Sequence, residues 1–267
     1  MPELSFEWFS DPQAWGALFT LSLLEIVLGI DNIVFLSILV DRLPEHQRKT
    51  ARLLGLGLAM FARLALLFSI TWIMGLTKPV FSFHLPEFLW NLSPQYKEHH
   101  GLLGVSVKDL ILFFGGAFLI WKATREIHHK LEGAGDSGVS VQANSFAAVL
   151  VQIMMIDVIF SLDSVITAVG MVNDPSRISL MMSAVIISVG VMMLASGSVS
   201  AFVSRHPSVK MLALSFLILI GTTLMAEGFH FHFPKGYIYF AMAFSLGVEM
   251  LNLRIRAKSQ APAAAEI

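Results

Sequence analysis

The chain has 267 residues, of which 55% are hydrophobic and only 14% are charged, and its formal net charge is −1. Soluble domains carry about 25% charged residues, so this composition excludes an ordinary soluble domain. The balanced charge provides no basic surface for a nucleic acid. The chain has no cysteine, which excludes disulfides, thiolate metal ligands and cysteine redox motifs.

Seven apolar segments are long enough, or nearly long enough, to cross a bilayer, which requires about 20 residues in a helix. The sequence therefore predicts an all-α, polytopic membrane protein with seven transmembrane helices. The N-terminus lacks the basic region and cleavage site of a signal peptide, so we expect the first span to remain in the mature protein. In chain order, the predicted spans are Ala14–Val40, Leu53–Leu76, Leu110–Ala123, Ser145–Val169, Ile178–Val203, Val209–Met225 and Tyr237–Leu253.

Basic residues are distributed unevenly between the two sets of loops. With the N-terminus outside, 12 Lys and Arg residues fall in cytosolic segments and 5 in external segments, and Arg63 remains inside a span. Short loops rich in Lys and Arg stay in the cytosol. We therefore predict an external N-terminus and, because the number of spans is odd, a cytosolic C-terminus.

The first and fourth spans contain nearly the same sequence, 132 positions apart. Residues 25–32 read Glu-Ile-Val-Leu-Gly-Ile-Asp-Asn and align without a gap with residues 157–164, Asp-Val-Ile-Phe-Ser-Leu-Asp-Ser. Each copy has two carboxylates six residues apart, followed by an amide or a hydroxyl. The two spans run in opposite directions, and three spans followed by three of inverted topology is a recurring transporter architecture.

This duplication predicts an inverted three-plus-three repeat plus one extra helix, all in a single transmembrane domain. The first repeat covers residues 14–123 and the second covers residues 145–225. Residues 124–144 would form a cytosolic connector, whose glycine-rich part is flexible by composition. The seventh helix, residues 237–253, lies outside the repeat.

Four carboxylates inside membrane spans require compensation. Each costs roughly 2.5–3.5 kcal/mol on a translocon scale unless it is protonated, paired or bound to a cation. Oxygen ligands suit Mg²⁺, Ca²⁺ and Mn²⁺, whereas zinc, copper and nickel usually recruit imidazole, and no histidine lies within a predicted span. We predict a divalent cation, Mn²⁺ favoured, as transported ligand, and no prosthetic group. The candidate metal ligands are Glu25, Asp31, Asn32, Asp157, Asp163 and Ser164.

Helical spacing limits how the two acids of one copy can act together. Residues i, i+4 and i+7 share a face, so Glu25, Gly29 and Asn32 form one stripe. The second acid, at i+6, lies about 120° away around a regular helix. Either each helix presents its acids to two neighbours, or it unwinds locally and brings them together. Since only the second arrangement aims both acids at one ion, we predict a bend or break near Gly29 and Ser161.

Other polar residues in or near the spans are further candidates. Arg63 could be a static counter-ion or a surrogate cation that holds the acids when the site is empty, and the sequence leaves both interpretations open. Glu227 and Glu249 are candidates for the ion pathway, although Glu249 lies about one turn from Arg254 and could simply pair with it. Ser106 and Asp109 are predicted to cap the third span. The external histidines, His84, His99, His100, His230 and His232, are predicted to be solvated side chains.

At the duplicated motif the chain resembles the TerC family of integral membrane proteins, within the LysE-type exporter superfamily. The resemblance runs from about residue 8 to 254 and matches the short form, which lacks a CBS-type module. It implies seven membrane helices with an inverted repeat, located in a bacterial-type plasma (inner) membrane, and export of metal ions, chiefly manganese. The residues that carry it are Leu24–Leu36, Asp157–Gly170, His206–Phe216 and Lys235–Phe244.

The sequence thus predicts a secondary transporter, not an enzyme, that exports a divalent cation through a midplane site. Its partners would be the metal ion and the bilayer, with protons as a candidate coupling ion; a homo-oligomer is compatible with the sequence. One alternative is a non-transporting scaffold for stress resistance or membrane-protein insertion. Another is an intramembrane aspartyl hydrolase, but neither Leu-Gly-Ile-Asp31 nor Phe-Ser-Leu-Asp163 matches the usual Gly-x-Gly-Asp turn of that class.

Overall fold

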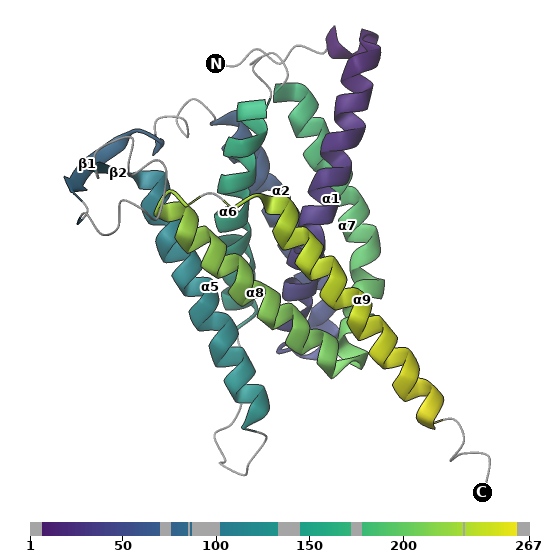
Figure 1. Cartoon of the computed structure of the whole chain (residues 1–267). Coiled ribbons are helices and arrows are strands. Elements are labelled where there is room, and N and C mark those ends of the chain that lie inside the picture. The colour runs from purple at the N-terminus through teal and green to yellow at the C-terminus, as the bar shows by residue number, and fades with distance from the viewer. Residues whose placement is uncertain are drawn as a thin grey trace, which may run out of the picture.

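Seven long helices and one pair of strands make up the part of the chain that the structure describes. The computed structural model describes residues 7–69, 76–84, 86, 102–132, 145–171, 178–231 and 233–260, without the side chains of several helical residues, including Asp31, Asp163 and Ser164. Each predicted span overlaps one helix, so the fold is mostly helical, as predicted. The helices are α1 (Pro12–Val40), α2 (Glu45–Phe68), α5 (Val107–Leu131), α6 (Phe146–Met171), α7 (Ile178–Arg205), α8 (Pro207–Gly228) and α9 (Lys235–Gln260) (Figure 1).

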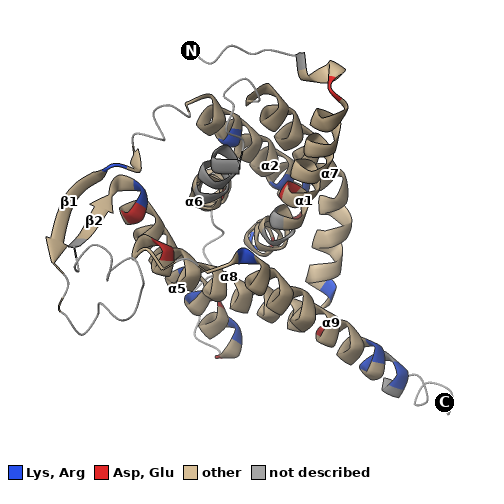
Figure 2. Cartoon of the chain, turned by 45° about the horizontal axis from the view of Figure 1, so that its top comes forward, with Lys and Arg blue, Asp and Glu red and all other residues tan. Residues whose placement is uncertain are grey.

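The lengths and apolar character of these helices confirm a polytopic membrane protein. Within the described residues, α1, α2, α7, α8 and α9 are long and apolar enough to cross a membrane. The apolar part of α6 is shorter, Phe146–Leu162. That α5 and α6 also cross the membrane stays a prediction. Lys and Arg side chains are concentrated towards helix ends, as over the last turns of α9 (Figure 2).

Local capping fixes where two of the helices begin. The Asp11 side chain accepts the N–H of Gln13 at 2.9 Å before α1, where Pro12 occupies the first turn. Ser106 and Asp109 form a capping box at the start of α5, which confirms the predicted cap. This helix then continues to Leu131, eight residues beyond the predicted span. The first part of the predicted connector is therefore helical, and residues 133–144 lie outside the described part of the chain.

A small antiparallel sheet precedes α5 and was not predicted. Its strands are β1 (Pro79–His84) and β2 (Leu102–Ser106). All of β1 is exposed, whereas Leu103 and Val105 of β2 are buried against Leu110 and Phe231. The sheet therefore packs where α5 begins and α8 ends (Figure 1).

The six helices α1, α2 and α5–α8 share one large hydrophobic cluster. In this bundle α1 lies along α7, α2 packs against α6 and α7, and α5 lies along α8 (Figure 1). The α5–α8 contact is closest at Gly116 and Gly221, where a side chain on either residue would overlap the backbone of the other helix. Helix α9 lies on the outside, and none of its most apolar window is buried.

The predicted break in the motif helices is wrong. Both α1 and α6 are continuous through Gly29 and Ser161. An unbroken helix satisfies its backbone hydrogen bonds internally, which favours it within a membrane. The two acids of each copy therefore remain about 9 Å apart along the helix axis and about 120° apart around it.

Candidate metal site

Arg63 of α2 joins the first acids of the two motif copies. Its Nη1 donates to Glu25 Oε2 of α1 at 2.7 Å, and its Nη2 donates to Asp157 Oδ1 of α6 at 2.7 Å. Its Nε also donates to Asp157 Oδ2 at 3.1 Å, so Asp157 is held by two prongs of the guanidinium. The three side chains are buried, with 6–12% of their surfaces exposed. Two acids that are 132 positions apart in the sequence thus share one cation.

Two neutral residues complete the contacts of Asp157. Asn32 Nδ2 donates to Asp157 Oδ1 at 3.3 Å, and Ser161 Oγ donates to Oδ2 at 3.1 Å. Asn32 belongs to the first copy and Asp157 to the second, so this bond also crosses between copies. Among the described residues Glu25 accepts a hydrogen bond only from Arg63. The two predicted first acids are therefore held unequally.

The charges of this cluster do not cancel. One guanidinium faces two carboxylates, which leaves one formal negative charge if both are ionised. Burying ions is costly in the low-dielectric interior, and a buried pair recovers that cost only with good geometry and further hydrogen bonds. The contacts with Arg63, Asn32 and Ser161 supply this for Asp157. Glu25 has less support and is the member better placed to receive a further cation.

A small cavity lies beside the cluster. Its volume is about 20 Å³ and its polar lining comes from Asn32 and Asp157. This is enough space for one water-sized occupant. The remaining lining is apolar: Phe35, Leu36, Leu56, Ala59, Ile153 and Ile156.

Three predicted ligands lie outside the described side chains: Asp31, Asp163 and Ser164. Their backbone positions follow from the continuous helices. Helices α1 and α6 run in opposite directions (Figure 1). Asp31 and Asp163 therefore lie towards opposite ends of the bundle from the Arg63 cluster. Among the described side chains there is no group of three or more acidic or histidine residues that could hold a metal.

The structure locates four other polar residues that the sequence singled out, and whether Glu227 and Glu249 belong to the ion pathway stays a prediction. Glu249 does not pair with Arg254 in the described part of the chain, and its Oε1 is buried without a hydrogen-bond partner there. His230 is not simply solvated, because its Nε2 lies 3.1 Å from Asp109 Oδ2. Glu227 lies in the last turn of α8, where its carbonyl accepts the N–H of His230. His84 is exposed, as predicted, whereas His99, His100 and His232 lie outside the described residues.

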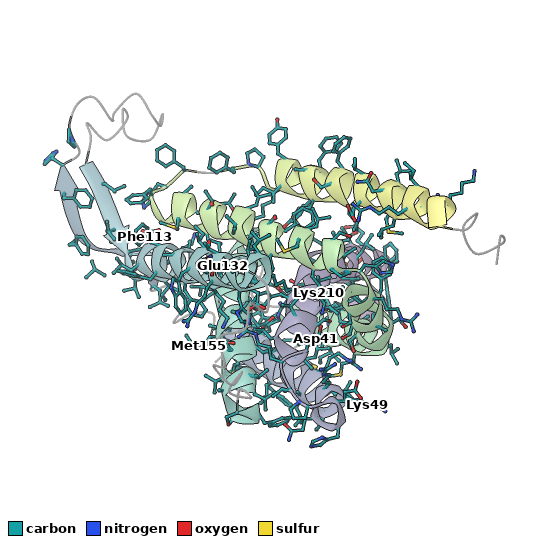
Figure 3. The ribbon with its side chains drawn as sticks, turned by 90° about the horizontal axis from the view of Figure 1, so that it is seen from below. Asp41, Lys49, Phe113, Glu132, Met155 and Lys210 are labelled. Carbon is teal, nitrogen blue, oxygen red and sulfur yellow. The ribbon has the colours of Figure 1, made fainter. Side chains whose placement is uncertain are left out.

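The sequence did not reveal a second set of ion pairs where α1 ends and α8 begins. Asp41 pairs with Lys210 and accepts from Ser204 Oγ at 3.0 Å, and Arg42 pairs with Glu126 of α5. Asp41 and Lys210 lie next to each other in Figure 3. The sequence predicted that these basic residues lie on the cytosolic side. That prediction does not identify the acid with which each of them pairs.

A family model described as integral membrane protein TerC family matches residues 10–262. The chain belongs to the TerC family. This TerC-family protein is 56% identical over 248 residues to the UPF0053 inner membrane protein YgdQ of Escherichia coli (strain K12), covering 93% of this chain and 96% of YgdQ. It is 49% identical over 259 residues to a UPF0053 protein of Haemophilus influenzae, covering 94% and 98% of the two chains.

The same region also occurs within a longer relative. The chain is 49% identical over 247 residues to the UPF0053 inner membrane protein YoaE of E. coli (strain K12), covering 92% of this chain but 44% of YoaE. A comparison with solved structures found no match. The TerC-family region thus carries the whole Arg63 cluster, since residues 25, 63 and 157 all fall within the family match.

Proposed function

We propose that this TerC-family protein is a secondary transporter that exports a divalent metal cation, with Mn²⁺ as the favoured cargo. The observation that carries the proposal is the sharing of Arg63 by Glu25 and Asp157, one acid from each motif copy. The cluster has a deficit of positive charge, oxygen ligands of the type that Mn²⁺ accepts, and a water-sized cavity beside it.

Helix packing supports an inverted repeat in which α1, α2 and α5 correspond to α6, α7 and α8. Exchange of the two repeats converts the α1–α7 contact into the α6–α2 contact, and both are extensive in the bundle. The same exchange maps the α5–α8 contact onto itself. This agrees with the positions of Gly116 and Gly221, each of which lies against the backbone of the other helix. The seven-span topology with an external N-terminus fits this arrangement. As YgdQ and YoaE are named inner membrane proteins, we assign the chain to the inner membrane.

In this topology the acids lie at three successive levels across the membrane. Asp31 lies on the cytosolic side of the Arg63 cluster and Asp163 lies on the external side, each about 9 Å away along its helix. A cation from the cytosol would pass Asp31, occupy the middle level beside Glu25 and Asp157, and leave past Asp163. Rocking of one repeat against the other would provide alternating access. Protons that titrate the same carboxylates are the candidate coupling ions.

Transport by the purified protein in liposomes is the direct test. We expect Mn²⁺ flux from the wild type, and loss of at least nine-tenths of it in Asp157→Asn, Asp31→Ala and Asp163→Ala. Glu132→Gln is the matched control, because Glu132 is an exposed acid at the end of α5. Wild-type liposomes without flux would reject the proposal, and a protein that still supports stress tolerance without flux would favour the scaffold. Full flux in all three acid variants would place the ion elsewhere.

A further inference from the structure

The sulfur of Met192 lies against the motif stripe of α1. Met192 of α7 is 3% exposed. Its Sδ and Cε occupy the space that a side chain on Gly29 would fill, and an added methyl group there would overlap the sulfur. Gly29 therefore serves close approach of α7 to α1 and does not mark a break.

This position brings the sulfur close to two members of the proposed site. Gly29 follows Glu25 by four residues and precedes Asn32 by three, so all three share one face of α1. Residues at these spacings have Cβ atoms about 5–6 Å apart. Met192 Sδ lies against Gly29, at a level between Glu25 and Asn32 along the helix. Glu25 and Asn32 both reach the Arg63 cluster through their side chains. Helix α7 contains no Asp or Glu, and the thioether of Met192 is its donor in direct contact with the motif stripe at Gly29.

The other repeat provides an independent indication that this position faces the site. With a shift of one residue relative to the 132-position spacing of the motif, residues 57–60, Gly-Leu-Ala-Met, align with residues 190–193, Gly-Val-Met-Met. Ala59 of α2 is thus the counterpart of Met192, and Ala59 lines the cavity that Asn32 and Asp157 border. The same position therefore lies beside the motif in both repeats, with a small side chain in one and a thioether in the other.

We infer that Met192 supplies a thioether ligand through which the carboxylate site selects a transition-metal cation over Mg²⁺ and Ca²⁺. This inference rests on the proposed transport function and names the cation class of that site. Oxygen ligands alone suit Mg²⁺, Ca²⁺ and Mn²⁺ alike, and selectivity among divalent ions depends on ligand type and geometry. A sulfur ligand is poorly accepted by the hard ions Mg²⁺ and Ca²⁺, whereas softer cations tolerate or prefer it. A sulfur ligand would therefore weaken the binding of Mg²⁺ to the site relative to that of the exported cation.

Competition between Mg²⁺ and Mn²⁺ in liposomes tests the role of the sulfur. Met192→Leu removes the sulfur and nearly conserves volume, a change that cores usually tolerate. We expect the Mg²⁺ concentration that halves Mn²⁺ transport to fall at least tenfold in this variant. Met193→Leu is the matched control, because Met193 lies next in sequence but contacts the Gly57 side of α2. Gly29→Ala displaces the sulfur without deleting it, and we expect it to shift the competition in the same direction.

Cadmium provides a readout of coordination that does not depend on transport. The chain has no cysteine, so any sulfur bonded to cadmium must come from methionine. X-ray absorption of the Cd²⁺-loaded wild type should show a sulfur ligand, and Met192→Leu should lose it while Met193→Leu keeps it. A cadmium site with oxygen ligands alone in the wild type overturns the inference, even if Met192→Leu does not fold. Unchanged Mg²⁺ competition in Met192→Leu also overturns it, whereas absence of Mn²⁺ transport by the wild type rejects the proposed function instead.

Discussion

The protein has two clusters of buried or half-buried charge, which differ in the ratio of cations to acids and in their exposure. At the end of α1, Lys210 and the more distant Arg48 pair with Asp41, and Arg42 pairs with Glu126, so the two acids face three cations. In the middle of the bundle Arg63 serves two acids. The Arg42 side chain is 31% exposed, whereas that of Arg63 is 6% exposed. The first cluster therefore has enough cations for its acids and is partly exposed at Arg42, whereas the second lacks a cation for one acid and is buried.

This difference distinguishes ion pairs that connect helix ends from the cluster that we propose as the metal site. Partly exposed pairs contribute little to stability because water screens them, with a median of about 0–1 kcal/mol. A buried charge that loses its partner costs several kilocalories per mole. The pairs at the end of α1 can hold helix ends together, and each acid there has a cation. The Arg63 cluster has two acids for one cation, so under the proposed function substitutions there should affect stability and metal response together.

Removal of Arg63 should have the largest effect. Arg63→Met leaves Glu25 and Asp157 without their counter-ion, and we expect a loss of roughly 3–5 kcal/mol in the free energy of unfolding. Thermal unfolding in detergent, with and without Mn²⁺, would measure it. If Arg63 is a surrogate cation, Mn²⁺ should stabilise the variant more than the wild type. An equal response to Mn²⁺ would instead identify Arg63 as a static counter-ion.

Arg63→Lys is the matched control for that experiment. It keeps the charge but cannot make the two-pronged contact with Asp157. We expect an intermediate stability and a small response to Mn²⁺. A variant as unstable as Arg63→Met would show that the geometry of the guanidinium, not its charge, supports the cluster.

Neutralising the two first acids should produce unequal effects. Asp157 accepts hydrogen bonds from Arg63, Asn32 and Ser161, whereas Glu25 accepts one from Arg63. We expect Asp157→Asn to cost about 3 kcal/mol and Glu25→Gln about 1 kcal/mol, because hydrogen bonds to charged groups contribute roughly 1.5–3 kcal/mol each and are only partly replaced by an amide. The same unfolding measurement compares them. Equal losses would contradict the asymmetry of the cluster.

The pairs at the end of α1 should tolerate the same treatment. Lys210→Met removes the nearest cation of Asp41, and the remaining contacts with Ser204 and Arg48 limit the expected loss to about 1 kcal/mol. Mn²⁺ transport in liposomes should be unchanged. The exposed pair His128–Glu132 provides the baseline, since Glu132→Gln should change stability by less than about 0.5 kcal/mol. Loss of transport in Lys210→Met would remove the distinction between the two clusters.

Much of this arrangement could be predicted from the sequence, and the failures have physical causes. Repetition of the motif in spans of opposite direction predicted that Glu25 and Asp157 would approach each other, and hydrophobic length located the helices. The role of Gly29 was misjudged, because a missing side chain permits both a break and a close approach, and only the neighbour Met192 distinguishes them.

Other features depend on partners that are distant in the sequence. The sheet of β1 and β2 joins strands separated by a long stretch of chain, for which a single sequence gives no pairing signal. Glu249 was expected to pair with Arg254 from spacing alone, but the structure leaves its Oε1 buried without a donor among the described residues. Whether Asp31 and Asp163 join the site stays a prediction.

The start of α5 offers a last and more selective test of the comparison. Asp109, in the first turn of α5 and outside the predicted span, is a single acid with its own donors, like Asp41 and Glu126. Burial raises the pKa of Asp109, but hydrogen bonds from His230 and Ser106 outweigh it and hold that pKa below its ordinary value of 3.8.

A carboxylate with a lowered folded pKa stabilises the protein above its unfolded pKa and loses this contribution as pH falls through the folded value. Asp109→Asn should therefore lower stability by about 1 kcal/mol at pH 7, as loss of a capping residue does. The difference from the wild type should shrink only below about pH 4. Unfolding measured across pH would check this, and a difference that stays constant below about pH 3 would mean that ionisation of Asp109 does not supply the contact.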